Sequence, residues 1–152
     1  MYRDISLYIV DIFIAIDKIK RYTAKFQNSD ELLWSEVEWD ATIRELEIIG
    51  EATKHLLNSD ILDREYRKIV DFRNVISHGY FGIDENEVWF VIKNKLDEFF
   101  KDLLDIIKLD NINILKALEF AKKENSKNLK LVEFLNKMIE KIKQGEKNEN
   151  QI

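Results

Sequence analysis

The absence of proline, together with only four glycines in 152 residues, is the feature that most limits what this chain can fold into. Proline and glycine are the residues that most often interrupt helices, so helices here can run for many turns. Apolar residues recur at intervals of three and four almost throughout, and no segment alternates as a half-buried strand does. These observations predict an all-α fold.

The apolar spacing and a few polar clusters place the helices along the chain. We expect helices over residues 3–26, 36–57, 63–77 and 84–107, followed by shorter ones over residues 112–123 and 126–143. Asp84, with Glu87 three residues later, is typical of a capped helix N-terminus. The second helix carries Gly50 in its middle, which predicts a close approach by another helix.

This helix order predicts one domain with an appendage. We interpret residues 1–107 as an up-and-down bundle of four core helices, residues 108–144 as a C-terminal helical hairpin, and residues 145–152 as a disordered tail. The hairpin has an apolar stripe, which predicts that it packs on the bundle or forms a dimer interface.

Composition narrows the classes of function. There is no cysteine, which excludes disulfides, cysteine-based zinc sites and thiol nucleophiles. No stretch of about 18 apolar residues is present, so we expect a cytoplasmic protein with no membrane partner. The net charge of -5 divides into -8 on residues 1–107 and +3 on the rest. An acidic body is a poor non-specific binder of nucleic acid, so any work on RNA needs a local basic pocket.

The segment 73–80 carries the densest chemistry in the chain, and its sequence is Arg-Asn-Val-Ile-Ser-His-Gly-Tyr. An arginine can hold a phosphate with two hydrogen bonds, and an imidazole can exchange protons near neutral pH. Arg73 and His78 could therefore cleave a phosphodiester through the 2′-hydroxyl of RNA, with Asn74 and Ser77 orienting either group. No carboxylate cluster for magnesium flanks them, so we expect no metal and no other cofactor.

Helix geometry separates the two main groups of this segment. Arg73 and His78 are five residues apart, which is about 140° of rotation on a helix, so they do not share a face. A symmetric dimer could instead place Arg73 of one chain near His78 of the other, and we favour such a composite site. The plain alternative is structural: His78 ends a helix and Arg73 pairs with Asp71 or a nearby glutamate.

Two motifs together resemble the HepT-like proteins, which are HEPN-domain toxins encoded beside a small nucleotidyltransferase. Residues 44–52, Arg-Glu-Leu-Glu-Ile-Ile-Gly-Glu-Ala, are similar to the Arg-x-Leu-Glu-x-Ile-Gly-Glu-Ala pattern of that family. Residues 73–84 are similar to its Arg-x4-His-x-Tyr motif, including the Asn after Arg and the Tyr-Phe-Gly-hydrophobic-Asp continuation. The resemblance covers about residues 2–107.

The resemblance implies an all-α homodimer of the type VII-like toxin–antitoxin class that cleaves RNA without a metal. It implies that Arg73 binds the phosphate, that His78 is the general acid/base and that Asn74 supports them. It also implies that the cognate nucleotidyltransferase antitoxin silences the toxin by transferring AMP from ATP to Tyr80, so ATP serves that partner and not this chain. The sequence does not identify the RNA target, and by analogy we expect a structured RNA such as tRNA.

Other residues have a supporting interpretation. Ser77 and Gly50 belong to the site or the dimer interface, and Arg44 with Glu47 form a structural ion pair or contact the antitoxin. We interpret His55 as an ordinary surface histidine. The chain lacks the proline and tryptophan often found before the family's Arg-x4-His motif, and residues 108–152 extend past the usual end of its pattern.

Two alternatives to a ribonuclease remain open. The first is a non-catalytic HEPN binding module that engages a nucleotidyltransferase without cutting RNA. The second is a structural four-helix protein without a site, which requires both motif matches to be accidental.

Overall fold

The computed structural model describes the backbone of residues 3–78 and 82–150 and the side chains of residues 3–76 and 82–148. Within these ranges the chain is helical and contains no strand, so the predicted all-α class is confirmed. The helices are α1 (Ile5–Thr23), α2 (Ser29–Leu33), α3 (Glu36–Asn58), the 3-10 turn η1 (Arg64–Tyr66), α4 (Arg67–His78), α5 (Glu85–Phe90), the π-helical segment η2 (Val91–Lys95), α6 (Leu96–Leu109), α7 (Leu115–Glu124) and α8 (Leu129–Asn150).

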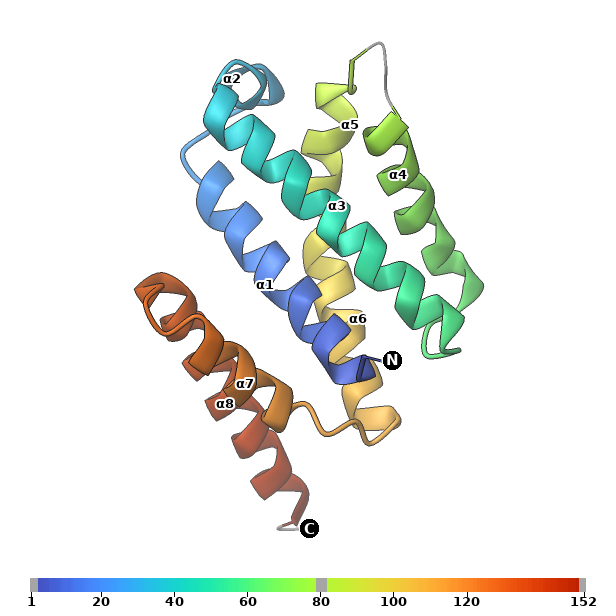
Figure 1. Cartoon of the computed structure of the whole chain (residues 1–152), viewed down its shortest axis with the longest axis vertical. Helices are drawn as coiled ribbons and strands as arrows, with labels where there is room; N and C mark the ends of the chain where they lie inside the picture. The colour runs from blue at the N-terminus through green and yellow to red at the C-terminus, as the bar shows by residue number, and fades with distance from the viewer. Residues whose placement is uncertain (1–2, 79–81, 151–152) are drawn as a thin grey trace.

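Helix α1 occupies the centre of the molecule, with α3 on one side, α6 behind it and the α7–α8 hairpin on another side (Figure 1). Its apolar residues face all of these neighbours, which is why nearly the whole middle of α1 is buried. The largest fully buried side chains of α1 are Ile9, Ile12, Phe13, Ile16 and Ile19. Because these residues recur every three or four positions, they form a continuous apolar core between the bundle and the hairpin.

Side-chain caps fix where several helices begin. Asp4 accepts a hydrogen bond from the Ser6 amide at 2.9 Å and starts α1. Asp84 accepts from the amides of Asn86 and Glu87 at 2.9 and 3.4 Å and starts α5, as the sequence predicts. These carboxylates satisfy amide groups that have no partner within the helix.

Three features of the fold differ from the predictions. The polar cluster after the first helix does not only end it, because Asn28 caps the short helix α2. The helix expected over residues 84–107 contains the π-helical segment η2, which inserts a wider turn between α5 and α6. The tail expected to be disordered continues α8 as far as Asn150. Its residues are mostly Glu, Lys, Gln and Asn, and Glu, Lys and Gln favour helix even when nothing packs against them.

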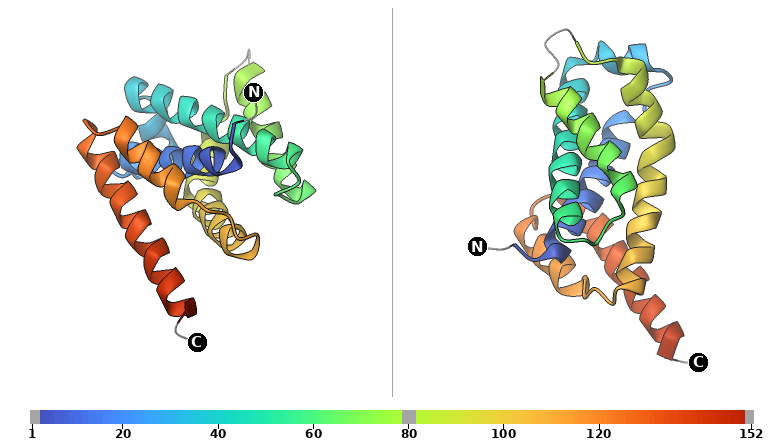
Figure 2. Two further views of the ribbon diagram at one scale, coloured as in Figure 1. Left: turned by 60° about the horizontal axis from the view of Figure 1, so that its bottom comes forward. Right: turned by 90° about the vertical axis from the view of Figure 1, so that its right-hand side faces the viewer.

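Helices α3 and α4 form an antiparallel pair on the side of the molecule away from the hairpin, and α4 leads into the segment that precedes α5 (Figure 2). The chain turns between them at Ser59 and Asp60, where Asp60 adopts a positive φ of 58°. The conformation is left-handed, which an aspartate tolerates better than most residues. This pair carries the candidate site.

Candidate functional site

Arg73 lies where α4 packs tightly against Gly50 of α3. A Cβ atom built on Gly50 would lie less than 3.0 Å from both Cβ and Cγ of Arg73, and 3.5 Å from its Cα. Only glycine leaves room for the aliphatic stem of the arginine at this crossing. The predicted reason for a glycine in the middle of this helix is therefore confirmed, and the element that approaches it is the one that carries the motif.

The guanidinium of Arg73 is held by two neighbours. Its Nη2 lies 3.4 Å from Oε2 of Glu51, and its Nη1 donates a hydrogen bond to Oδ1 of Asn74 at 3.1 Å. Its Nε is buried and has no hydrogen-bond partner among the described residues. The side chain as a whole is 31% exposed, so part of the guanidinium faces solvent in an orientation that the protein sets.

The sequence predicts the partners of the Arg73 guanidinium only in part. The sequence leaves open a pairing with Asp71 or with a nearby glutamate, and the carboxylate that contacts the guanidinium belongs to Glu51 on α3. Asn74 contacts Arg73 directly, and its role in catalysis remains a prediction. The structural and the functional interpretations of Arg73 are thus compatible, because the ion pair fixes the group without burying it.

A second histidine adjoins this arrangement. Nε2 of His55 lies 3.5 Å from Oε1 of Glu51, so one carboxylate stands between Arg73 and an imidazole. The imidazole stacks on the ring of Tyr8 from α1, with centroids 4.3 Å apart and planes 12° apart. The guanidinium of Arg3 covers that tyrosine ring at 4.9 Å from its centroid. Glu51 and Tyr8 therefore hold the His55 imidazole in place, and its side chain is still 43% exposed.

The sequence alone does not connect Glu51 and His55 with the site. Its one indication is their spacing of four residues, which places them on one face of the helix one turn apart. Nothing in the sequence, however, shows that Tyr8 from the first helix lies beneath the imidazole. Contacts of this kind depend on how α1 packs against α3.

The structure describes the other predicted site residues only in part. Ser77 and His78 lie in the last turn of α4, and their side chains are outside the described residues, as is the whole of Tyr80. Arg44 is exposed and Glu47 is half-buried on α3, and neither forms an ion pair within the described part of the chain. Their contact with an antitoxin remains a prediction.

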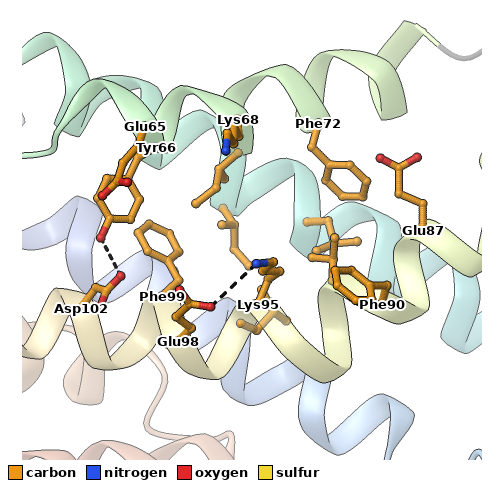
Figure 3. A pocket seen from close by; sticks show the side chains of 15 residues that line it. Glu65, Tyr66, Lys68, Phe72, Glu87, Phe90, Lys95, Glu98, Phe99 and Asp102 are labelled. Carbon is orange, nitrogen blue, oxygen red and sulfur yellow. Dashed lines mark hydrogen bonds and ion pairs between the residues drawn. The ribbon is translucent and has the colours of Figure 1, made fainter.

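A groove of about 410 Å³ lies on the other flank of α4, between that helix and the α5–α6 rod (Figure 3). Its walls include Phe72, Phe90 and Phe99, and the hydroxyl of Tyr66 donates to Oδ2 of Asp102 at 2.6 Å across one end. Arg73 is not among its lining residues. Four carboxylates and two lysines line the groove, a balance that does not favour a phosphate.

The described residues contain neither a cluster of metal-ligating side chains nor a membrane-spanning helix. No group of three or more His, Asp or Glu side chains there is placed to hold a metal ion. No helix among those residues is long and apolar enough to cross a bilayer.

Comparison with known proteins identifies the family. The family model described as "Ribonuclease HepT-like" matches residues 12–106. A Methanocaldococcus jannaschii protein named "Gamma-glutamylcyclotransferase and putative RNase" is 32% identical over 147 residues, which covers 92% of this chain and 66% of that protein. A "Putative RNase" of the same organism is 30% identical over 66% of this chain and 94% of its own length. A "Probable ribonuclease HepT" of Thermococcus cleftensis is 35% identical over 59% of this chain and 83% of its own length. No solved structure matches.

The first of these relatives also bears on the C-terminal hairpin. A match over 92% of 152 residues spans about 140 positions, so it must include α7 and at least half of α8. This chain in turn spans just under two thirds of that relative's length. The family match contains α3 and α4 with Gly50, Glu51 and Arg73, the crossing at which the candidate site lies. The chain belongs to the HepT-like ribonuclease family.

Proposed function

We propose that this chain is a metal-independent endoribonuclease and the toxin of a toxin–antitoxin pair. The observation that carries the proposal is the state of Arg73, whose guanidinium is oriented by Glu51 and Asn74 and remains 31% exposed. A fixed, partly exposed guanidinium can bind a phosphate and offset the charge that develops on its oxygens during cleavage. The family match and the names of the relatives support the choice of RNA as the substrate.

The reaction needs no metal when the nucleophile is the ribose 2′-hydroxyl. A base removes the 2′-hydroxyl proton, the 2′-oxygen forms a bond to phosphorus, and the bond from phosphorus to the 5′-oxygen breaks. The products are a 2′,3′-cyclic phosphate and a 5′-hydroxyl, which takes a proton from an acid. In the proposal Arg73 holds the phosphate and His78 exchanges one of these protons.

The proposal extends to partners. The chain acts as a homodimer in which Arg73 of one protomer faces the partner's His78, because the two residues do not share a face of one helix. A nucleotidyltransferase antitoxin silences it by AMP transfer to Tyr80, where added phosphate charge repels the RNA backbone. Both statements rest on the family resemblance and on helix geometry.

One observation favours the non-catalytic binding module as a second candidate. The Glu51 carboxylate already pairs with Arg73, and the body of the chain is acidic, so phosphate must compete with an internal carboxylate. In that case Arg73 serves the fold and a partner protein rather than RNA.

Cleavage of labelled total RNA in excess EDTA separates the two candidates. Partner-free wild-type protein should cleave, and Arg73→Ala and His78→Ala should not. Lys54→Ala is a matched control, because Lys54 is an exposed cation on the same helix as Glu51. Equal cleavage by wild type and both variants would reveal a contaminating nuclease. No cleavage by wild type, with an intact mass that shows no AMP on Tyr80, would favour the binding module.

A further inference from the structure

The α7–α8 hairpin lies beyond the part of the chain that the family model covers. That model ends at residue 106, and α7 begins at Leu115. The buried residues of the hairpin, among them Leu118 and Leu131, join the core around α1. This packing accounts for the apolar face of the hairpin and leaves its charged outer side free to contact another molecule.

The positive charge of the C-terminal region is concentrated in α7 and the turn that follows it. Residues 115–132, here called the lysine segment, contain five lysines and two glutamates, whereas residues 133–152 contain four lysines and four glutamates. The lysine segment therefore has a net charge of +3, and the remainder of the chain has a net charge of -8. Its lysines are Lys116, Lys122, Lys123, Lys127 and Lys130. None of them forms an ion pair within the described part of the chain, so their charge is available to a ligand.

Two of these lysines share a face of α7 with an exposed aromatic ring. Lys116, Phe120 and Lys123 follow one another at intervals of four and three residues, so they lie along one side of the helix. All three side chains are exposed, and that of Phe120 is exposed to 50%. Glu119 and Glu124 are the carboxylates of the same helix, and the lysines of the segment outnumber them. Cations that alternate with an accessible ring are typical of surfaces that bind single-stranded nucleic acid.

A hollow of about 320 Å³ adjoins this face, between α7 and the start of α1. Lys116 and Phe120 line it from α7, and Asp4 and Leu7 line it from α1. The Asp4 carboxylate is engaged in capping α1, because it accepts hydrogen bonds from the amide and the hydroxyl of Ser6 at 2.9 and 2.7 Å. The hollow thus offers an ammonium group to a phosphate and a ring to a base.

The start of α1 lies between this hollow and the α3–α4 pair (Figure 1). Leu7 lines the hollow, and the next residue, Tyr8, stacks its ring on His55 of α3. The His55 imidazole lies 3.5 Å from the Glu51 carboxylate, which in turn contacts Arg73. The first turns of α1 therefore connect the two places, and an RNA strand long enough to cross them can contact both.

We propose that the lysine segment is an RNA-binding site that holds the substrate strand at a distance from the phosphate bound by Arg73. Its lysines bind backbone phosphates and Phe120 stacks on a base, so the site binds single-stranded RNA without regard to sequence. It supplies the local basic surface that an acidic body otherwise lacks. The choice of RNA rests on the proposed ribonuclease function, and an acidic protein is the competing occupant that the experiment excludes or reveals.

Binding is tested apart from cleavage with a fluorescent oligonucleotide of about 12 nucleotides that is 2′-O-methylated throughout and so has no 2′-hydroxyl nucleophile. Its affinity is measured by anisotropy between about 50 and 300 mM NaCl. The test variant is Lys116→Gln/Lys123→Gln/Lys127→Gln. The matched control, in the neutral part of α8, is Lys137→Gln/Lys141→Gln/Lys143→Gln. Both variants change the net charge by the same amount, and glutamine favours helix about as well as lysine does.

We expect the test variant to bind about 10- to 100-fold more weakly at about 50 mM salt. The slope of log affinity against log salt should become shallower by about 2, because three phosphate contacts are lost. The control variant should match wild type in both measurements. Arginine at the three test positions should restore the affinity, since it keeps the charge.

Phe120→Leu tests the stacking contact separately. It should weaken binding about 5- to 100-fold and leave the salt slope unchanged, because stacking neutralises no phosphate. Phe90→Leu is its matched control, since Phe90 is 53% exposed but lies at the acidic groove. Equal affinities for these two variants would remove the stacking role of Phe120.

Cleavage assays distinguish the failure of this inference from the failure of the proposed function. The test variant should raise KM for long labelled RNA and leave cleavage of a ribodinucleotide unchanged, because a dinucleotide is too short to reach α7. Test and control variants that bind alike refute the RNA site, even where wild type cleaves RNA, and assign the lysine segment to a partner other than RNA. Binding that depends on the lysine segment, without any cleavage, upholds the RNA site and removes the endoribonuclease. Wild-type protein that neither binds nor cleaves removes both.

Discussion

Replacing Gly50 with alanine tests whether the α3–α4 crossing positions Arg73. In an open helix the change should stabilise the fold by about 1 kcal/mol, because alanine is the better helix former. Here the new methyl carbon would lie less than 3.0 Å from two carbons of Arg73, against an optimum of about 3.5–4.0 Å. Because the atoms it meets belong to the rigid start of the side chain, the helices must part. Overpacking of this kind costs about 1–3 kcal/mol.

The expected net effect of Gly50→Ala is therefore a loss of about 0–2 kcal/mol in the free energy of unfolding, measured by urea titration. Gly145→Ala is the matched control, because a methyl group there meets nothing within 4 Å and should stabilise α8 by up to about 1 kcal/mol. In an Arg73→Gly background, Gly50→Ala should become stabilising. The interaction free energy between positions 50 and 73 in this double-mutant cycle should be about 1–3 kcal/mol. Equal stabilisation by both glycine replacements in the otherwise native chain would refute the close-packed crossing.

Two further predictions concern other polar groups. Tyr66→Phe removes the 2.6 Å hydrogen bond to Asp102 at the end of the groove and should lower the free energy of unfolding by about 1–2 kcal/mol in urea titration, because the acceptor is a carboxylate. Burial raises the pKa of Glu45 above its ordinary value of 4.5 even though Lys18 lies 3.9 Å away, so the folded state holds that proton more tightly than the unfolded state does. Stability should consequently fall as the pH rises from 4.5 through the raised pKa, and Glu45→Gln should flatten that part of a stability–pH curve measured by urea unfolding. A steeper curve in the glutamine variant would contradict this reasoning.

Much of the fold follows from the sequence because apolar spacing and breakers are local. The predicted helix over residues 36–57 agrees closely with α3, and the gap predicted between the helices that end at residue 107 and begin at residue 112 contains Asn111, which takes a positive φ of 54°. The π-helical segment η2 could not be predicted in the same way, because Val88, Ile92 and Leu96 keep a spacing of four and look like an unbroken helix. A wider turn changes the path of the backbone without changing the pattern.

The same distinction applies to the candidate site: the local sequence predicts some of its features, and the others depend on how the helices pack. The motif identifies Arg73 and Asn74, and Gly50 indicates a close crossing. The sequence does not show that the crossing pairs Gly50 with Arg73 rather than with another residue. That register determines which carboxylate reaches the guanidinium, and hence that Glu51 rather than Asp71 does so.

Two consecutive residues of α3, Gly50 and Glu51, contact different parts of the Arg73 side chain. Gly50 lets the Cβ and Cγ atoms of Arg73 lie against the helix, and the next residue, Glu51, contacts the end of the same side chain. A lysine at position 73 could keep the first contact but could not hold two neighbours with the planar fork of a guanidinium. A larger residue at position 50 would keep the carboxylate but move the stem away from it. The observed position of Arg73 therefore requires both residues. Gly50 leaves room for the aliphatic stem, and Glu51 holds the guanidinium while part of the side chain stays exposed to solvent.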